Sequence, residues 1–320
     1  MAFDAWMERH QIALYLLAIA AGGAVGLAAP STAPTLASAV TPVLALLLFA
    51  TFLGIPLIRL GRAITDLRFL LIVIAVNFVV APLVAFALSR FVADDEALVI
   101  GVLLVLLTPC VDYVIVFTGL AGGARERLLA ATPVLMLLQV LLLPLYLVTF
   151  VGAPTVALIE VGPFAWAFVG LILIPLCAAG ILQGLGGRHG SARTAASVMQ
   201  RLMVPLVMAT LALVVGSQIA AIGARAGALV SLVPLYAAFL AVMALVGVLA
   251  GRLARLDAAA TRAVAFSGAT RNSLVVLPLA LAMPGPMALA ALAVVTQTLV
   301  ELVGMLLLVR VLPRLTGSSR

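Results

Sequence analysis

Long apolar segments, each bounded by glycine, proline or charged residues, follow one another along almost the whole chain. A helix of about 20 apolar residues is long enough to cross the hydrocarbon core of a bilayer. Ten such segments occur, at about 11–29, 36–57, 68–92, 97–119, 130–151, 163–185, 200–222, 229–251, 261–283 and 287–311. The pattern therefore predicts an all-α polytopic membrane protein with ten transmembrane helices.

Composition agrees with this prediction and argues against a soluble fold. The 320 residues are 66% hydrophobic and 9% charged, with a mean hydropathy of +1.34, whereas soluble domains carry about 25% charged residues. The net charge of +7 comes from arginine without lysine, which favours a GC-rich bacterial genome and hence a bacterial cytoplasmic (inner) membrane. The arginines stand singly between apolar segments, so we expect the lipid bilayer as a partner and no nucleic acid.

The positions of the 18 arginines test the count of ten spans. Fifteen of them fall in connections on one side of the predicted membrane, Arg90 and Arg225 fall on the other side, and Arg271 lies inside a span. Positive charge concentrates in cytoplasmic connections. Both termini are therefore predicted to be cytoplasmic.

The second half of the chain resembles the first at an offset of about 162 residues. Three correspondences share this offset: Thr41-Pro42 with Val204-Pro205, Pro109-Cys110 with Arg271-Asn272, and Gln139 with Glu301. We expect one five-helix repeat over 1–155 and a second over 156–320, inverted because five is an odd number of crossings. Inverted repeats are typical of secondary transporters, in which broken helices meet at the bilayer midplane and form the binding site.

Spans four and nine are predicted to be discontinuous. Proline lacks an N–H and crowds the preceding helical turn, so we expect Pro109 to interrupt span four and Pro278 to interrupt span nine. Polar residues flank Pro109 and precede Pro278, and we expect five of them to bind the solute: Thr108, Cys110, Arg271, Asn272 and Ser273.

Charged side chains inside predicted spans each cost several kcal/mol and so need a function or a partner. Glu301 follows Gln297 by one helical turn, so the two side chains share a face. Together with Asp112 they are the predicted ion- or proton-coupling group. For Glu301 two interpretations stay open, a proton or substrate site and a structural pair with Arg271. Arg271 either holds an anionic substrate or neutralises one of the two acids.

The two cysteines differ in their surroundings. Cys110 follows the predicted break, where a local helix N-terminus favours the thiolate and sulfur favours soft partners, although buried cysteine is also a common inert residue. Cys177 has no polar neighbours. From the residues alone, Cys110 is a candidate to bind a soft electrophile, and we expect no structural metal.

Motifs for other chemistry are missing from the sequence, including phosphate-binding loops, paired-histidine zinc sites and the serine-hydrolase elbow. We therefore expect no enzymatic activity, and no cofactor other than a proton or sodium as coupling ion.

Asn77, a lone amide in the third span, is predicted to hydrogen-bond to another helix.

Three motifs are informative together: Asn77-Phe78-Val79-Val80-Ala81-Pro82, Leu107-Thr108-Pro109-Cys110 and Ala269-Thr270-Arg271-Asn272-Ser273. With them the chain resembles the bile acid:sodium symporter superfamily over nearly its whole length, and most closely the arsenical resistance branch of arsenite efflux permeases. The resemblance implies that spans four and nine cross, and that Cys110 and Glu301 match the family's essential thiol and carboxylate. It also implies two domains, a panel of 11–57 and 163–222 and a core of 68–151 and 229–311.

In that branch the solute is trivalent arsenic or antimony hydroxide, exported against protons. Here Val111-Asp112-Tyr113 departs from the small or apolar residues that generally follow the Pro-Cys step. On this resemblance we expect proton-coupled export of an arsenite-like solute, with the core rocking against the panel over small residues such as Gly22-Gly23 and Gly26. Three alternatives stay open: a sodium-coupled importer of organic anions held by Arg271, a membrane hydrolase that uses Asp112, and a passive pore. Monomer and homodimer are both compatible with the pattern.

Overall fold

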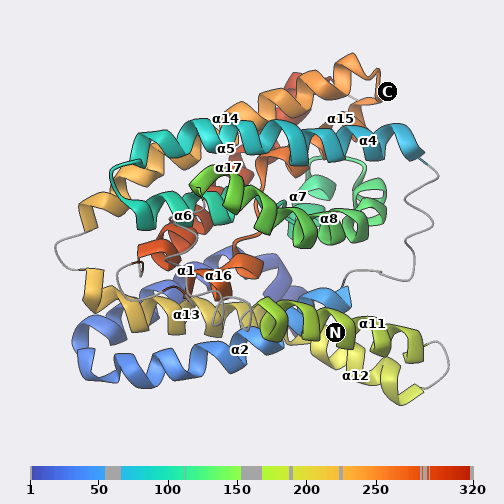
Figure 1. Cartoon of the computed structure of the whole chain (residues 1–320). Coiled ribbons are helices and arrows are strands. Elements are labelled where there is room, and N and C mark those ends of the chain that lie inside the picture. Colours follow the sequence, from blue (N-terminus) through green and yellow to red (C-terminus); the bar gives the residue numbers. More distant parts are fainter. Residues whose placement is uncertain are drawn as a thin grey trace. The chain divides into compact units, whose positions relative to one another are not determined.

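The computed structural model shows a helical chain (Figure 1). The residues that it describes are 2–54, 66–111, 113–152, 168–186, 190–222, 226–281, 283, 287 and 289–317. Within these ranges the regular elements are helices, and paired extended backbone is confined to an isolated bridge between Pro109 and Arg271. Helices satisfy their backbone polar groups internally, which a chain in lipid requires. The all-α prediction is confirmed.

Several described helices are long and apolar enough to cross a membrane: Pro30–Gly54, Leu67–Val92, Arg125–Val151, Leu229–Leu253 and Leu289–Thr316. The pair Gly190–Arg201 and Met203–Ser217 adds one candidate that is bent by 46°. Shorter apolar helices, among them Ala13–Ala28, Glu96–Leu106 and Ile174–Gly186, lie at other expected spans. The protein is therefore a multi-pass membrane protein, and the count of ten spans stays a prediction.

Contacts divide the chain into two units, and each unit combines stretches that are far apart in sequence. Unit 1 comprises Met1–Gly54 and Gly162–Ala228, and unit 2 comprises Ile55–Val161 and Leu229–Arg320. In Figure 1, unit 1 contains the blue and the yellow-green to golden helices, and unit 2 contains the cyan to green and the orange to red helices.

Unit 1 is built around α13. Its elements are α1 (Ala2–Ala28), η1 (Pro30–Thr32), α2 (Ala33–Gly54), η6 (Phe168–Leu173), α11 (Ile174–Gly186), α12 (Gly190–Arg201) and α13 (Met203–Ile222). α13 packs against α1 and α2, while α11 packs against α2 and α12. The N-terminal and middle stretches of the chain thereby share one core.

Glycines allow α1 and α13 to approach closely. A Cβ atom added at Gly22 would lie 2.3 Å from the carbonyl oxygen of Ala212, and one added at Gly26 would lie 2.3 Å from that of Gly216. Gly23 also faces α13. The prediction that these glycines form a sliding surface between domains is wrong, because all three face a helix of their own unit. A stripe of small residues predicts close packing but does not identify the partner helix.

α12 is a helix that the hydropathy pattern does not predict, since it falls almost entirely between the sixth and seventh expected spans. It is held against the end of α2, where the last backbone carbonyls have no helical partner. Gln200 of α12 donates to the carbonyl of Leu53 over 3.0 Å, and Gln183 of α11 donates to that of Phe52 over 3.1 Å. α12 is thus attached to α2 through a polar side chain, and a pattern of apolar residues alone does not reveal α12.

Unit 2 holds the candidate site. Its elements are α4 (Leu67–Ala75), the π-helix η4 (Val76–Val80), α5 (Ala81–Ser89), η5 (Arg90–Val92), α6 (Glu96–Leu106), α7 (Tyr113–Leu120), α8 (Arg125–Val151), α14 (Ala226–Leu253, from Leu229 on), α15 (Ala258–Ala269), α16 (Ser273–Leu281) and α17 (Leu289–Thr316). α17 packs against α6, α15 and α16, and α15 also contacts α4, α7 and α8. Four of these helices, α6, α7, α15 and α16, are each too short to cross a bilayer alone.

Candidate functional site

Two interrupted helices of unit 2 meet at their breaks. α6 ends at Leu106 and α7 begins at Tyr113, while α15 ends at Ala269 and α16 begins at Ser273. A break removes the helical partners of several N–H and C=O groups. Such groups are costly to leave unpaired at membrane depth, so their partners have to come from neighbouring segments.

The two breaks supply each other with backbone partners. The N–H of Cys110 donates to the carbonyl of Thr270 over 3.2 Å, and the N–H of Asn272 donates to the carbonyl of Thr108 over 2.8 Å. The two donors, Cys110 and Asn272, are 162 residues apart, and so are the two acceptors, Thr108 and Thr270. The bridge between positions 109 and 271 has the same spacing.

The threonines of the two breaks form another matched pair. The hydroxyl of Thr108 donates to the carbonyl of Leu104 over 3.2 Å, and that of Thr270 donates to the carbonyl of Phe266 over 2.8 Å. Both contacts return to the residue four positions earlier, a pattern that bends helices. The hydroxyl of Thr108, a predicted solute ligand, also lies 3.0 Å from the carbonyl of Val105 and 3.5 Å from that of Asn272 in the other break.

Glu301 of α17 reaches the second break. Its side chain is 1% exposed, and its Oε2 accepts a hydrogen bond from the backbone N–H of Arg271 over 2.7 Å. Gln297, one turn earlier, donates to the same oxygen, as the spacing of the two residues predicts. The carboxylate is therefore held just before the first turn of α16, where the helix dipole favours negative charge.

The side chain of Arg271 is fully buried and bonds to backbone oxygens. Nη2 donates to the carbonyls of Ser267, over 3.2 Å, and Gly268. Nη1 donates to the carbonyl of Leu106 over 3.4 Å. The guanidinium group thus joins the last turn of α15 to the end of α6.

Asn77 and Phe239 complete the surroundings of this guanidinium group. Asn77, in η4, accepts from Nη2 of Arg271 over 2.9 Å and donates to the hydroxyl of Ser267 over 2.9 Å. The helix-to-helix hydrogen bond predicted for Asn77 is confirmed. The ring centroid of Phe239, in α14, lies 5.2 Å from Cζ of Arg271, within cation–π range. The sequence did not point to either residue as a partner of Arg271, although positions 77 and 239 share the offset of 162.

Asn272 and Ser273 begin α16. Oδ1 of Asn272 accepts from the N–H of Val275 over 3.2 Å, which is the contact of an N-cap. The hydroxyl of Ser273 accepts from Thr298 of α17 over 2.7 Å, a residue that the sequence did not single out. Nδ2 of Asn272 and Oε1 of Gln297 are buried without a hydrogen-bond partner among the described residues. These two atoms are therefore candidate donor and acceptor groups for a ligand or water.

The structure gathers most of the predicted site residues. We call the place where the two breaks meet the crossing. The predicted site residues on its two segments are at most 2% exposed: Thr108, Cys110, Arg271, Asn272 and Ser273. Gln297 and Glu301 reach the crossing from α17. Asp112 lies outside the described residues. Cys177 is exposed on α11, in unit 1.

The predicted helix break at Pro278 is wrong. α16 continues through this position from Ser273 to Leu281, and the chain leaves helical geometry earlier, where α15 ends. The N–H groups of Arg271 and Asn272 bond to other segments, and this diversion interrupts the helix without a proline. Pro109, by contrast, lies within the non-helical stretch of the first break.

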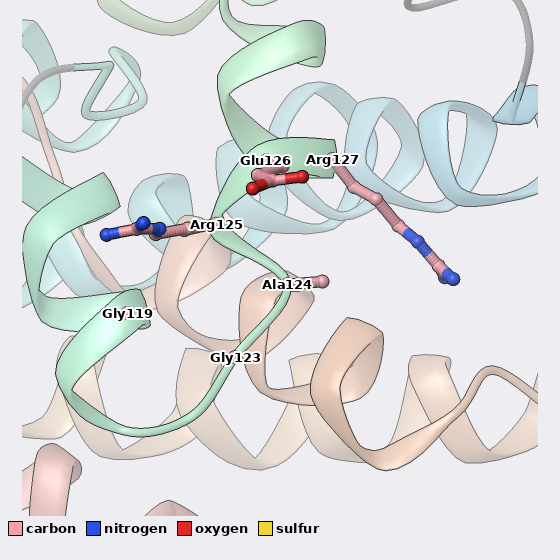
Figure 2. Close-up of a pocket in the computed structure, with 6 residues that line it drawn as sticks. All are labelled: Gly119, Gly123, Ala124, Arg125, Glu126 and Arg127. Atoms are coloured by element: carbon pink, nitrogen blue, oxygen red, sulfur yellow. The ribbon is translucent and has the colours of Figure 1, made fainter.

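A separate hollow lies at the turn between α7 and α8. It has a volume of about 350 Å³ and is lined by Gly119, Gly123, Ala124, Arg125, Glu126 and Arg127. Figure 2 shows Arg125 and Arg127 pointing in opposite directions. Arg127 forms ion pairs with Asp257 over 2.9 Å and Asp66 over 3.5 Å, and these aspartates cap α15 and α4. No residue of the two breaks lines the hollow. We therefore assign Arg127 a structural role, in which it links the N-terminal ends of α4 and α15.

Comparison with known proteins identifies a family. Residues 41–231, more than half of the chain, match the model of the Sodium Bile acid symporter family. The matched stretch contains the first break and α8, and it ends within α14. No curated protein matches the chain.

Proposed function

The chain belongs to the sodium bile acid symporter family, whose members are transporters, and from this premise we propose that it exports arsenite-like solutes in exchange for protons. The solute would be the uncharged hydroxide of trivalent arsenic or antimony, as in the arsenical resistance branch that the motifs resemble. One observation carries the proposal. The buried carboxylate of Glu301 is bonded to the same crossing that buries the thiol of Cys110.

The chemistry of the crossing suits a small hydroxylated solute. The sulfur of Cys110 is a soft ligand, and its side chain is fully buried in the second half of the first break. Nδ2 of Asn272 supplies an unused donor and Oε1 of Gln297 an unused acceptor among the described residues. A hydroxide of arsenic or antimony offers the complementary O–H donors and oxygen acceptors.

Glu301 is the proposed proton carrier. Its Oε2 accepts hydrogen bonds from the N–H of Arg271 and from Gln297, and hydrogen bonds to an ionised acceptor are about twice as strong as those to a neutral one. Protonation therefore weakens both contacts and loosens α17 from the start of α16. We propose that Glu301 takes up an external proton as the solute leaves. Asp112, two residues after the thiol, is the second proposed coupling residue.

The proposed architecture is a pair of inverted repeats, 1–155 and 156–320, with ten spans. The matched backbone hydrogen bonds at the crossing support it, because a two-fold relation exchanges them. We propose that unit 1 serves as the panel and unit 2 as the core, and that movement of one unit relative to the other alternates access. The division of contacts into these units supports the assignment.

We place the protein in a bacterial inner membrane with both termini in the cytoplasm. The arginines of the connections support this orientation. The proposed transport needs a proton gradient and no cofactor, and either a monomer or a homodimer is sufficient for it, because the crossing is formed within one chain.

Sodium-coupled uptake of an organic anion is the second candidate function, and the name of the matched family favours it. In that mechanism Arg271 would bind the carboxylate or sulfonate of the substrate. Its guanidinium group donates to four protein oxygens, which supports a structural role and hence the arsenite proposal. Sodium-dependent uptake of an organic anion by cells that produce the protein would decide for this alternative.

Everted membrane vesicles test the proposal directly. With a proton gradient, vesicles that contain the wild-type protein are expected to accumulate arsenite, and Cys110→Ser is expected to abolish the accumulation. Cys177→Ser, a change of the exposed cysteine on α11, is the matched control and is expected to behave as the wild type. Unchanged accumulation with Cys110→Ser would remove the thiol from the mechanism, and no accumulation by the wild type would refute the solute class. Growth of an arsenite-sensitive host, with and without Glu301→Gln, provides the corresponding test in cells.

A further inference from the structure

Three of the backbone carbonyls at the crossing, those of Leu106, Ser267 and Gly268, lack their usual helical partners. In a continuous helix the carbonyls of Leu106, Ser267 and Gly268 would accept from the N–H groups at positions 110, 271 and 272. Here those N–H groups donate to Thr270, Glu301 and Thr108 instead. Three carbonyl oxygens are therefore left to be satisfied at the ends of α6 and α15.

These three oxygens share one partner, the guanidinium group of Arg271. Oδ1 of Asn77 adds a fourth oxygen from η4, at 2.9 Å. Helix C-termini carry negative partial charge, and this set of oxygens contains no donor. Together the four oxygens form an enclosure that favours a cation.

Oxygen sets of this kind bind coupling ions in other secondary transporters, where half-helix C-terminal ends and unwound carbonyls coordinate sodium. In this chain the position is filled from within the molecule. The guanidinium group is fully buried and lies against the ring of Phe239.

From this arrangement we infer that the guanidinium group of Arg271 is a tethered cation that occupies a cation-binding site at the crossing, so that the transport cycle neither binds nor moves a sodium ion there. The inference rests on the proposed transport function for its role in coupling. The site itself is defined by the oxygens of Leu106, Ser267, Gly268 and Asn77, whatever the solute is.

The inference predicts the behaviour of purified protein in lipid nanodiscs. The wild type is expected to melt at the same temperature in sodium chloride and in choline chloride. Arg271→Ala is expected to melt at a lower temperature, and millimolar methylguanidinium chloride is expected to restore part of the loss in a saturable way. The double variant Arg271→Ala/Asn77→Leu lacks one of the four oxygens and is expected to lose this rescue. Methylguanidinium is expected to have no stabilising effect on the wild type.

Two results would overturn the inference: a sodium-specific rise in the melting temperature of the wild type, or a folded Arg271→Ala protein that methylguanidinium does not stabilise. If Arg271→Ala does not accumulate as folded protein, the melting temperatures of Arg271→Lys and of the wild type in sodium chloride and in choline chloride are compared instead. Both keep a tethered cation and are expected to be insensitive to sodium, and a sodium-specific rise in either one would overturn the inference. These measurements contain no arsenite, so a failure of arsenite export would leave them unaffected and would count against the proposed solute alone.

Discussion

The two breaks that meet in unit 2 share a pair of backbone hydrogen bonds but differ in length and in chemistry. Each donates one N–H to the other, and each carries a threonine that bonds back to its own helix. At the next two positions, however, the first break has Pro109 and Cys110 where the second has Arg271 and Asn272. A neutral amide, Gln139, stands at the position in α8 that corresponds to Glu301 in α17.

This difference shows how two segments with matching backbone hydrogen bonds can present different side chains. The N–H of Arg271 holds the carboxylate of Glu301, whereas proline has no N–H to offer at the corresponding place. At position 139, which corresponds to Glu301 in the proposed repeat, the side chain is uncharged. The first break thus carries the buried thiol of Cys110, whereas the second carries Arg271, whose N–H holds the carboxylate of Glu301.

The largest expected effect separates Glu301 from Gln139. Glu301→Gln keeps the size of the side chain and an oxygen for the N–H of Arg271, but it cannot load a proton. We expect the accumulation of arsenite in everted vesicles to fall to the level of vesicles without the protein.

Gln139→Leu is the matched control at the corresponding position. Gln139 is 1% exposed, its Oε1 has no partner among the described residues, and its Nε2 contacts only the sulfur of Met136 in the part of the chain that the structure describes. Replacing such a group with an apolar one of similar size is nearly neutral, so export is expected to stay at the wild-type level. Equal loss in both variants would refute the division of roles between the halves.

The sequence predicts the helical fold, the break at Pro109 and the meeting of Gln297 with Glu301, because each depends on local spacing. It does not predict the partners of Arg271. Those depend on which N–H groups the crossing diverts, and the crossing joins segments that are far apart in the chain. For the same reason the sequence places the second break at Pro278, although hydrogen bonds to other segments interrupt the helix earlier.

A second comparison sets Asn77 against Phe239, the two residues at corresponding positions that enclose the guanidinium group. Asn77→Leu removes one oxygen from a buried cation and the donor to Ser267, and loss of one partner of a buried charge costs about 3 kcal/mol or more. Phe239→Leu keeps all four oxygens and loses part of a buried ring, which we expect to cost about 1 kcal/mol. Equilibrium unfolding in mixed detergent micelles measures both. A cost for Phe239→Leu equal to that for Asn77→Leu would show that packing, not charge pairing, dominates here.

A third prediction tests the correspondence of the halves itself. If the halves correspond, position 139 faces Pro109, which has no N–H, so Gln139→Glu alone is expected to bury an unpaired carboxylate and to be destabilising. Pro109→Ala provides that N–H, so the double variant is expected to recover about 2 kcal/mol relative to the sum of the single changes, the value of a hydrogen bond to a charged group. A double-mutant cycle of unfolding free energies measures this coupling. Independent, additive effects would contradict the proposed inverted repeat.

The smallest expected effect concerns Asn272 and Cys110, which occupy corresponding positions but begin their helices differently. Oδ1 of Asn272 caps α16, which starts at the next residue, whereas α7 starts three residues after Cys110. Asn272→Ala is therefore expected to lower the free energy of unfolding by about 1 kcal/mol. Asn272→Ser restores a capping oxygen without the buried Nδ2 donor, so we expect near wild-type stability together with weaker arsenite export. This pair of variants separates the two roles of one side chain, because stability follows the capping oxygen and transport follows the donor. Full export by Asn272→Ser would remove Nδ2 from the proposed solute site and leave Asn272 as a helix cap.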